Sequence, residues 1–270
     1  MKRITSGLMS AICVLCSISL SALADDTIAI IGTGDLGDSF GPRFSSLGYR
    51  VVYGSRNPDS DRVRELLKRT GNGATAEDQK EASRQGDIVL LAIPWPAMET
   101  VARNLGDLDG KIIIDVSFPW TQGEDGYPDI AVETSSAEMI QDWNPGAKVV
   151  KALATMGSLI IDDPMAAGGV ITIPLASNHR DAKERVAGLV AELGLDPVDF
   201  GPLRMARAIE TMQLIYVIPL LQRRTEEWEF FFRRSADWVC RWQDDWREPV
   251  YDADQLAEMP ETQDPPKPCH

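Results

Sequence analysis

The chain has 270 residues and a formal net charge of −14, with 41 acidic against 27 basic side chains. This acidity argues against nucleic acid as a partner, because affinity for a duplex comes mostly from neutralising its phosphates. Two histidines and four cysteines are too few for a histidine-based zinc centre, a Ser-His-Asp triad or a cysteine framework, so we expect no metal site.

Residues 1–24 have the composition of a removable secretory signal. Lys2 and Arg3 precede an apolar, serine-containing stretch that ends in an A-x-A cleavage site at Ala24. An uncleaved anchor is the alternative, since the stretch is close to the roughly 20 residues that span a bilayer. Because the positive charges keep the N-terminus in the cytoplasm, we predict cleavage and a periplasmic or secreted protein. A membrane-anchored or cytoplasmic protein is the alternative.

Short apolar runs alternate with amphipathic segments over residues 25–200, which is typical of a parallel sheet wrapped by helices. We therefore expect an α/β fold with a doubly wound, Rossmann-type parallel sheet in one domain. The expected strands are 27–31, 49–53, a short one near 74, 87–93, 111–116, 148–153, 169–176 and 196–200. The expected helices are 36–47, 59–69, 76–85, 135–143 and 181–193, and a loop rich in proline, glycine and aromatic residues covers 118–129.

The pattern beyond this domain becomes helical, which predicts a C-terminal α-helical extension over 201–247. Its helices are expected at 203–221 and 225–246, with a kink or break at Pro219, because proline lacks the amide proton that a helix interior needs. Residues 248–270 are acidic, rich in proline and poor in apolar side chains. We predict that they form a disordered tail.

An aromatic stripe marks the second of these C-terminal helices, because Trp238, Trp242 and Trp246 recur every four residues. Packing on the sheet domain, a homodimer contact and a membrane surface are the three interpretations, in that order. Acids and arginines are balanced here, which makes a membrane surface an unfavourable partner. Whether Cys240 and Cys269 form a disulfide stays open at this stage.

A dinucleotide-binding fingerprint, GxGxxG, lies between the first predicted strand and the first predicted helix. The first glycine permits a tight turn, the second lets a pyrophosphate approach the backbone, and the third allows the helix to pack closely on the strand. The alternative is an ordinary glycine-rich turn. We predict dinucleotide binding at six residues: Gly32, Thr33, Gly34, Asp35, Leu36 and Gly37.

The end of the second predicted strand indicates which dinucleotide is preferred. An NAD site normally has an acidic residue there, whereas this chain has Ser55, Arg56 and Asn57. A guanidinium and a hydroxyl suit a 2′-phosphate, which a carboxylate would repel. The sequence therefore favours NADP(H), with a solvated turn arginine as the alternative for Arg56.

These motifs resemble the deazaflavin (cofactor F420)-dependent NADP reductases and the related cytosolic NADPH domains of six-transmembrane ferric reductases. The resemblance covers roughly residues 25–221 and includes the blocks at 30–37, 54–58, 93–95 and 201–210. It implies that Thr33, Ser55 and Arg56 hold the adenosine-phosphate side of NADP(H). It also implies that the nucleotide cleft is lined after the fourth strand by Ile93, Pro94 and Trp95, with core packing as the alternative for the tryptophan.

The acceptor side is less clearly marked. Resemblance places residues 151–158 near the nicotinamide, where Thr155, Met156 and Ser158 are candidate substrate residues. Local hydrogen bonding within the loop is the favoured alternative for the two hydroxyls. Archaeal deazaflavin reductases have a histidine where this chain has Ala154, but hydride transfer needs positioning and exclusion of water, with no protein acid or base.

The sequence thus predicts an NADP(H)-dependent oxidoreductase with a flavin- or deazaflavin-like acceptor. Two alternatives remain open at this stage. One is a reductase of a small carbonyl or imine substrate. The other is a nucleotide-binding partner protein without turnover, which would dock another redox component through its aromatic helix.

Overall fold

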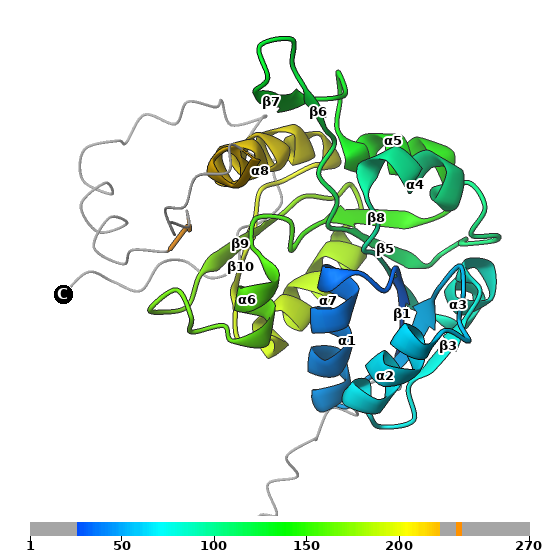
Figure 1. The fold of residues 1–270 in the computed structure, drawn as a ribbon. Helices are drawn as coiled ribbons and strands as arrows, with labels where there is room; N and C mark the ends of the chain where they lie inside the picture. Colours follow the sequence, from blue (N-terminus) through cyan, green and yellow to red (C-terminus); the bar gives the residue numbers. More distant parts are fainter. Residues whose placement is uncertain (1–25, 222–230, 234–270) are drawn as a thin grey trace, which may run out of the picture.

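The computed structural model describes residues 26–221 and 231–233, and its centre is a six-stranded parallel sheet (Figure 1). The strand order is β3-β2-β1-β4-β5-β8, with every neighbouring pair parallel. From β1 the chain first adds strands on one side, to β3, and then on the other side, from β4 to β8. This change of side beside β1 is typical of doubly wound folds, and it confirms the predicted fold class. The strands are β1 (Thr27–Ile31), β2 (Arg50–Gly54), β3 (Thr75–Glu77), β4 (Ile88–Leu91), β5 (Ile112–Asp115) and β8 (Lys148–Lys151).

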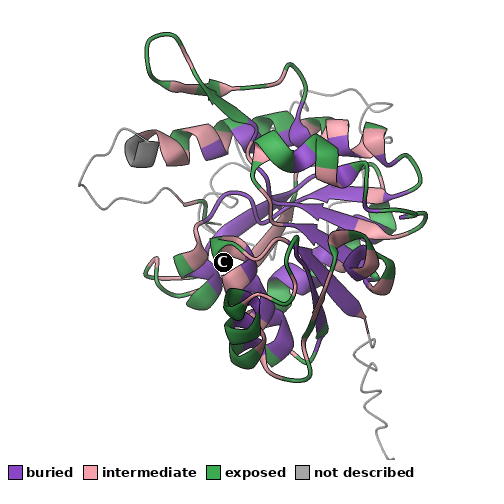
Figure 2. Cartoon of the chain, turned by 45° about the vertical axis from the view of Figure 1, so that its right-hand side comes forward, coloured by how far each residue is buried: buried purple, intermediate pink, exposed green. Residues whose placement is uncertain are grey.

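Helices cover both faces of this sheet because its central strands are apolar on both sides. In β1, Ile28 and Ile30 pack with one set of helices and Ala29 and Ile31 with the other. Figure 2 shows the resulting buried layer along the strands. The first set is α1 (Asp35–Ser46), α2 (Asp61–Thr70), α6 (Ser158–Asp162) and α7 (Arg180–Glu192), and the second is α3 (Gln79–Gln85), α4 (Trp95–Ala102), α5 (Ser136–Trp143), the 3₁₀ turn η1 (Leu203–Met205) and α8 (Ala206–Leu221).

Two smaller strand pairs complete the fold. β9 (Thr172–Leu175) and β10 (Asp196–Asp199) pair in parallel, and a bridge between Lys151 and Ala176 connects them to β8. β6 (Trp120–Gln122) and β7 (Pro128–Ile130) form an antiparallel hairpin, visible at the top of Figure 1 beside α8. The interpretation of residues 118–129 as a plain loop is therefore wrong, because their backbone pairs across the hairpin.

Several predicted boundaries also need correction. The third helix begins at Gln79 and not at Ala76, because residues 75–77 pair with β2 and the Asp78 carboxylate accepts a hydrogen bond from the Glu81 amide at 2.9 Å. The short helices α4 and α6 were not predicted. Pro219 lies within α8, which continues to Leu221, so the proline does not end the helix.

The predicted helix over 225–246 is wrong at residues 231–233, which are not helical. The Phe232 carbonyl accepts a hydrogen bond from the Thr172 amide at 2.7 Å, so this segment pairs with a strand backbone that would otherwise need another partner. The rest of that helix, the tryptophan stripe, Cys240, Cys269, the acidic tail and the leader lie outside the described residues. Within the described residues, none of the helices has the length and apolar character needed to cross a membrane.

Candidate cofactor and acceptor site

Two glycines of the fingerprint are required by close packing. Gly32 has φ +121°, and a Cβ there would lie 2.2 Å from the carbonyl oxygen of Ala92 on the neighbouring β4 side. A Cβ on Gly37 would lie 2.2 Å from the carbonyl oxygen of Gly32. The first and third glycines therefore allow the loop, α1 and β4 to meet, as the motif predicts.

The middle glycine, Gly34, is different because it faces open space. A Cβ built on it has no neighbouring atom within 4 Å, and its φ of −79° is accessible to any residue. Gly34 is the N-cap of α1, and no side chain that the structure describes caps this end of the helix. An uncapped helix N-terminus presents free N–H groups and a partial positive charge, so this end of α1 suits a phosphate.

The end of β2 carries the three residues predicted to select NADP(H). Ser55 is buried, and its Oγ accepts a hydrogen bond from the Asn57 amide at 3.1 Å, which holds the turn in shape. Arg56 is exposed and makes no hydrogen bond or ion pair with any residue in the described ranges. Its guanidinium is therefore available for an anion at the carboxyl end of β2, next to the fingerprint loop.

A cleft of about 380 Å³ opens where the parallel strands end, in the size range of small-ligand pockets. It brings together the segments that follow four strands, β1, β4, β5 and β8, and one side of α8. Of the predicted site residues, those that line it are Gly34, Asp35, Leu36, Ile93, Pro94, Trp95 and Met156. Those that do not line it are Gly32, Thr33, Gly37, Ser55, Arg56, Asn57, Thr155 and Ser158.

Trp95 fulfils both of the roles considered for it. Its ring lines the cleft and also stacks on Trp143 of α5, with ring centroids 6.1 Å apart and an interplanar angle of 22°. The Arg103 guanidinium lies over the other tryptophan, 5.4 Å from its ring centroid. Cleft lining and core packing are therefore compatible at this position.

The inner part of the cleft has apolar walls. Val116, Phe118, Leu153 and Ala154 line it, and the only charged lining residue within the described chain is Asp35. Leu153 has φ +57°, a conformation that costs about 1–2 kcal/mol for a residue with a Cβ. This turn carries the chain from β8 along the cleft wall, and no sequence pattern predicts it.

Two polar side chains in the cleft wall were missed by the sequence reasoning. Ser117, after β5, and Gln213, on α8, both line the cleft and are each 5% exposed. The Ser117 Oγ and the Gln213 Oε1 are buried and have no hydrogen-bond partner among the described residues. Because an unpaired buried oxygen is costly, both atoms call for a functional explanation.

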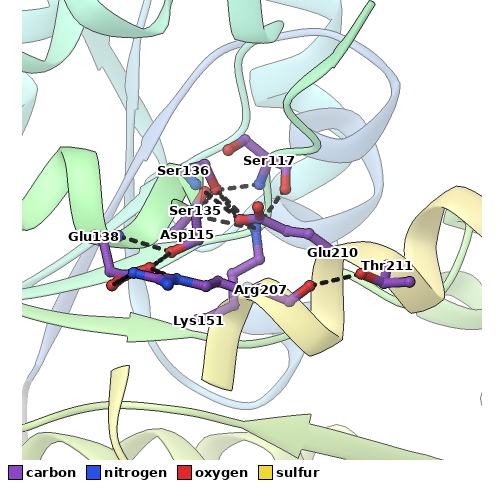
Figure 3. A network of polar contacts seen from close by, with 9 residues as sticks. All are labelled: Asp115, Ser117, Ser135, Ser136, Glu138, Lys151, Arg207, Glu210 and Thr211. Carbon is purple, nitrogen blue, oxygen red and sulfur yellow. Dashed lines mark hydrogen bonds and ion pairs between the residues drawn. The ribbon is translucent and has the colours of Figure 1, made fainter. Parts of the chain in front are cut away.

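A buried charge cluster, shown in Figure 3, contacts this wall through the backbone of Ser117. The Lys151 Nζ is 3.1 Å from Asp115 Oδ2 and 3.1 Å from Glu210 Oε1, and all three side chains are at most 1% exposed. The ammonium also donates to the Ser136 hydroxyl at 2.9 Å and to the Ser117 carbonyl at 2.6 Å. One cation thus joins β5, β8, the start of α5 and α8.

The cluster contains two carboxyl groups for one ammonium, and this excess of acidic groups affects the pKa of Glu210. Burial is the main cause that raises the pKa of Glu210 above its ordinary value, and the nearby Asp115 carboxylate raises it further, while Lys151 opposes both. The Glu210 Oε2 has no hydrogen-bond partner within the described residues. The Glu210 carboxyl therefore keeps its proton to a higher pH than an exposed glutamate does.

Comparison with known proteins identifies the family. The family model "NADP oxidoreductase coenzyme F420-dependent" matches residues 27–119. The F420-dependent NADP reductase of Methanothermobacter thermautotrophicus is 30% identical over an alignment of 200 residues that covers 68% of this chain and 84% of that protein. Human metalloreductase STEAP2 is 30% identical over 189 residues, 70% of this chain but only 36% of that larger protein.

A solved structure agrees with these relatives. The crystal structure of a putative F420-dependent NADP reductase from Arthrobacter sp. FB24 superposes with a TM-score of 0.69 at 27% identity. The match covers 78% of this chain and 99% of that one. The chain therefore belongs to the family of F420-dependent NADP reductases, which are NADP-dependent oxidoreductases.

Proposed function

We propose that this chain binds NADP(H) at the fingerprint loop and transfers hydride between NADPH and a flavin- or deazaflavin-like acceptor in the adjoining cleft. The observation that carries the proposal is the position of Gly34. It combines an uncapped helix N-terminus with open space, and it lies at one end of a cleft whose lining is mostly apolar. The Methanothermobacter thermautotrophicus relative is an F420-dependent NADP reductase, which supports the same chemistry.

Residues that follow β1, β2 and β4 would hold NADP(H). Backbone amides around Gly34 and Asp35 would hold the pyrophosphate, with Thr33 and Leu36 beside them. Arg56 would pair with the 2′-phosphate, supported by Ser55 and Asn57. When bound, NADPH supplies the hydride. The nicotinamide end would lie against the residues that follow β4, namely Ile93, Pro94 and Trp95.

The contribution of the protein to the reaction is positioning and exclusion of water. The apolar wall at Leu153, Ala154 and Met156 would face the reacting rings and keep solvent away from them. A flat conjugated ring fits such walls. A small hydroxy or imino acid fits poorly, because the lining has no cationic residue within the described chain to pair with its carboxylate.

A panel of acceptors tests the reaction. Purified protein and NADPH are mixed with a deazaflavin, FMN, a quinone, a ferric chelate and a cyclic imine, and NADPH oxidation is followed by absorbance. We expect oxidation with a deazaflavin or flavin and none with the imine. NADPH binding without oxidation by any acceptor would instead support the nucleotide-binding partner without turnover.

The role of Arg56 gives a prediction about cofactor choice. Replacing Arg56 by Asp should weaken NADPH binding by about 10- to 100-fold, because a charge-assisted contact of about 1.5–3 kcal/mol is lost. NADH lacks the 2′-phosphate and should bind as before or better. Fluorescence titration of both cofactors measures the ratio, with Arg56→Lys as the intermediate variant that keeps the charge. Unchanged NADPH affinity in Arg56→Asp would contradict the assignment of Arg56 to the 2′-phosphate.

We also propose that the chain is exported and cleaved after Ala24. The first described strand begins at Thr27, so cleavage would remove none of the described elements. Mass spectrometry of the protein from fractionated cells is expected to find Asp25 as the first residue. An intact leader in a cytosolic or membrane fraction would contradict export and give the protein ordinary access to cellular NADPH.

A further inference from the structure

The Lys151 cluster holds in place both residues that carry the unpaired oxygens of the cleft wall. Asp115 Oδ1 accepts a hydrogen bond from the Ser117 amide at 2.8 Å, and Lys151 donates to the Ser117 carbonyl at 2.6 Å. The peptide groups on both sides of Ser117 are therefore fixed by the charge cluster. Its side chain is thereby held at the cleft wall, although its hydroxyl has no partner among the described residues.

The same cluster fixes the other polar residue. Glu210 and Gln213 are three residues apart on α8, a spacing that places them on the same face of the helix. Glu210 Oε1 accepts hydrogen bonds from the Ser136 amide at 2.9 Å and from its hydroxyl at 2.6 Å, in addition to its ion pair with Lys151. This anchor holds the turn of α8 that carries Gln213 against the sheet.

We propose that the Ser117 hydroxyl and the Gln213 side-chain amide bind the hydrogen-bonding edge of the acceptor, and that the Lys151 cluster positions them. The inference rests on the proposed function, since it assigns residues of the same cleft. One torsion suffices to turn each group toward a ligand, because serine has three staggered rotamers and the terminal amide torsion of glutamine is broad. Pairing would recover the cost of two buried unpaired oxygens.

The chemistry of this pair defines the class of acceptor. A hydroxyl and a primary amide can each donate and accept hydrogen bonds. They complement a ring edge on which an N–H lies beside carbonyl groups, as in the pyrimidine edge of flavins and deazaflavins. A quinone offers acceptors only and satisfies half of this capacity. The cleft should therefore distinguish an imide-bearing ring from a quinone of similar size.

Binding without turnover tests the proposal. Full-length protein saturated with NADP⁺ is titrated with riboflavin and, separately, with menadione, a quinone without an N–H group. Ser117→Ala and Gln213→Met should each weaken riboflavin binding by about 3- to 10-fold, the equivalent of one net hydrogen bond. Menadione can accept hydrogen bonds from these groups but cannot donate to them, so its binding should weaken by a smaller factor than that of riboflavin. Thr211→Val, an exposed change on α8, is the matched control and should alter neither.

Stability separates recognition from a structural role. Each variant removes a buried oxygen that has no partner within the described residues, so thermal unfolding should occur at the same or a higher temperature than in the wild type. Weaker riboflavin binding together with retained stability supports the proposal. Equal effects on both probes, or no effect on riboflavin, would overturn it. Failure of the wild type to bind NADP⁺ would instead overturn the proposed function.

Discussion

Replacing Lys151 by Met is expected to lower the free energy of unfolding by about 3–5 kcal/mol, because it removes the only cation from a cluster of two buried carboxyl groups. Asp115 and Glu210 would then repel each other inside the protein, and the Ser117 carbonyl and Ser136 hydroxyl would each lose a donor. Urea unfolding followed by circular dichroism measures the loss. A change below about 1 kcal/mol would contradict the structure of the cluster.

Glu210→Gln is the informative companion to this variant. It leaves one ammonium with one carboxylate, and the glutamine Oε1 can accept the same hydrogen bonds from Ser136 and Lys151. We expect a change in stability of no more than about 1 kcal/mol. The double variant Lys151→Met/Glu210→Gln should recover part of the loss, because a single carboxylate remains buried. Lack of any recovery would mean that packing, and not charge, determines the effect.

The stability of the wild type relative to Glu210→Gln should depend on pH. The pKa of Glu210 is raised in the folded protein, mainly by burial, so between its ordinary value of 4.5 and the folded value the native state binds more protons than the unfolded state. Glu210 therefore favours folding most at low pH, and this contribution is lost as the pH rises through the folded pKa. The wild type should lose stability relative to Glu210→Gln over that rise.

The fold was predictable where the signal is local. Every residue from Thr27 to Ile31 is buried, so an apolar run sufficed to place β1. The role of Gly37 could be predicted for the same reason, because its contact is with Gly32 in the same motif, whereas Gly32 meets Ala92 on the distant β4 side. The helix α4 escaped prediction because Pro94 and Pro96 flank its first residue and suggest a loop, although proline is well tolerated in a first helical turn.

The acceptor side of the cleft could not be predicted because its residues meet only in the folded chain. Lys151 lies 36 residues from Asp115, and Ser136 lies 74 residues from Glu210. Each looks like an ordinary charged or polar residue beside its sequence neighbours. Of the candidates Thr155, Met156 and Ser158, which the resemblance placed near the nicotinamide, only Met156 lines the cleft, together with Leu153 and Ala154.

Gly34→Asp is expected to stabilise the fold while abolishing cofactor binding. Gly34 has the extended conformation of an N-cap, and an aspartate there can accept hydrogen bonds from the free amides of α1. These are the amides proposed to hold the pyrophosphate. The carboxylate would both occupy them and repel a phosphate, so the Kd for NADPH should rise by at least about 100-fold, while the unfolding temperature stays constant or rises.

Two further glycine variants show whether the effect comes from the site or from the fold. Gly34→Ala adds a methyl group in open space and should retain stability, with a smaller loss of NADPH affinity. Gly32→Ala places a methyl group 2.2 Å from the Ala92 carbonyl oxygen at a φ of +121°, so it should lower stability and binding together, by about 2–4 kcal/mol of unfolding free energy. Calorimetry and NADPH titration on the same samples separate these outcomes. If Gly34→Asp bound NADPH like the wild type, the pyrophosphate would have to bind away from the α1 N-terminus, and the proposed orientation of the cofactor across the cleft would be wrong.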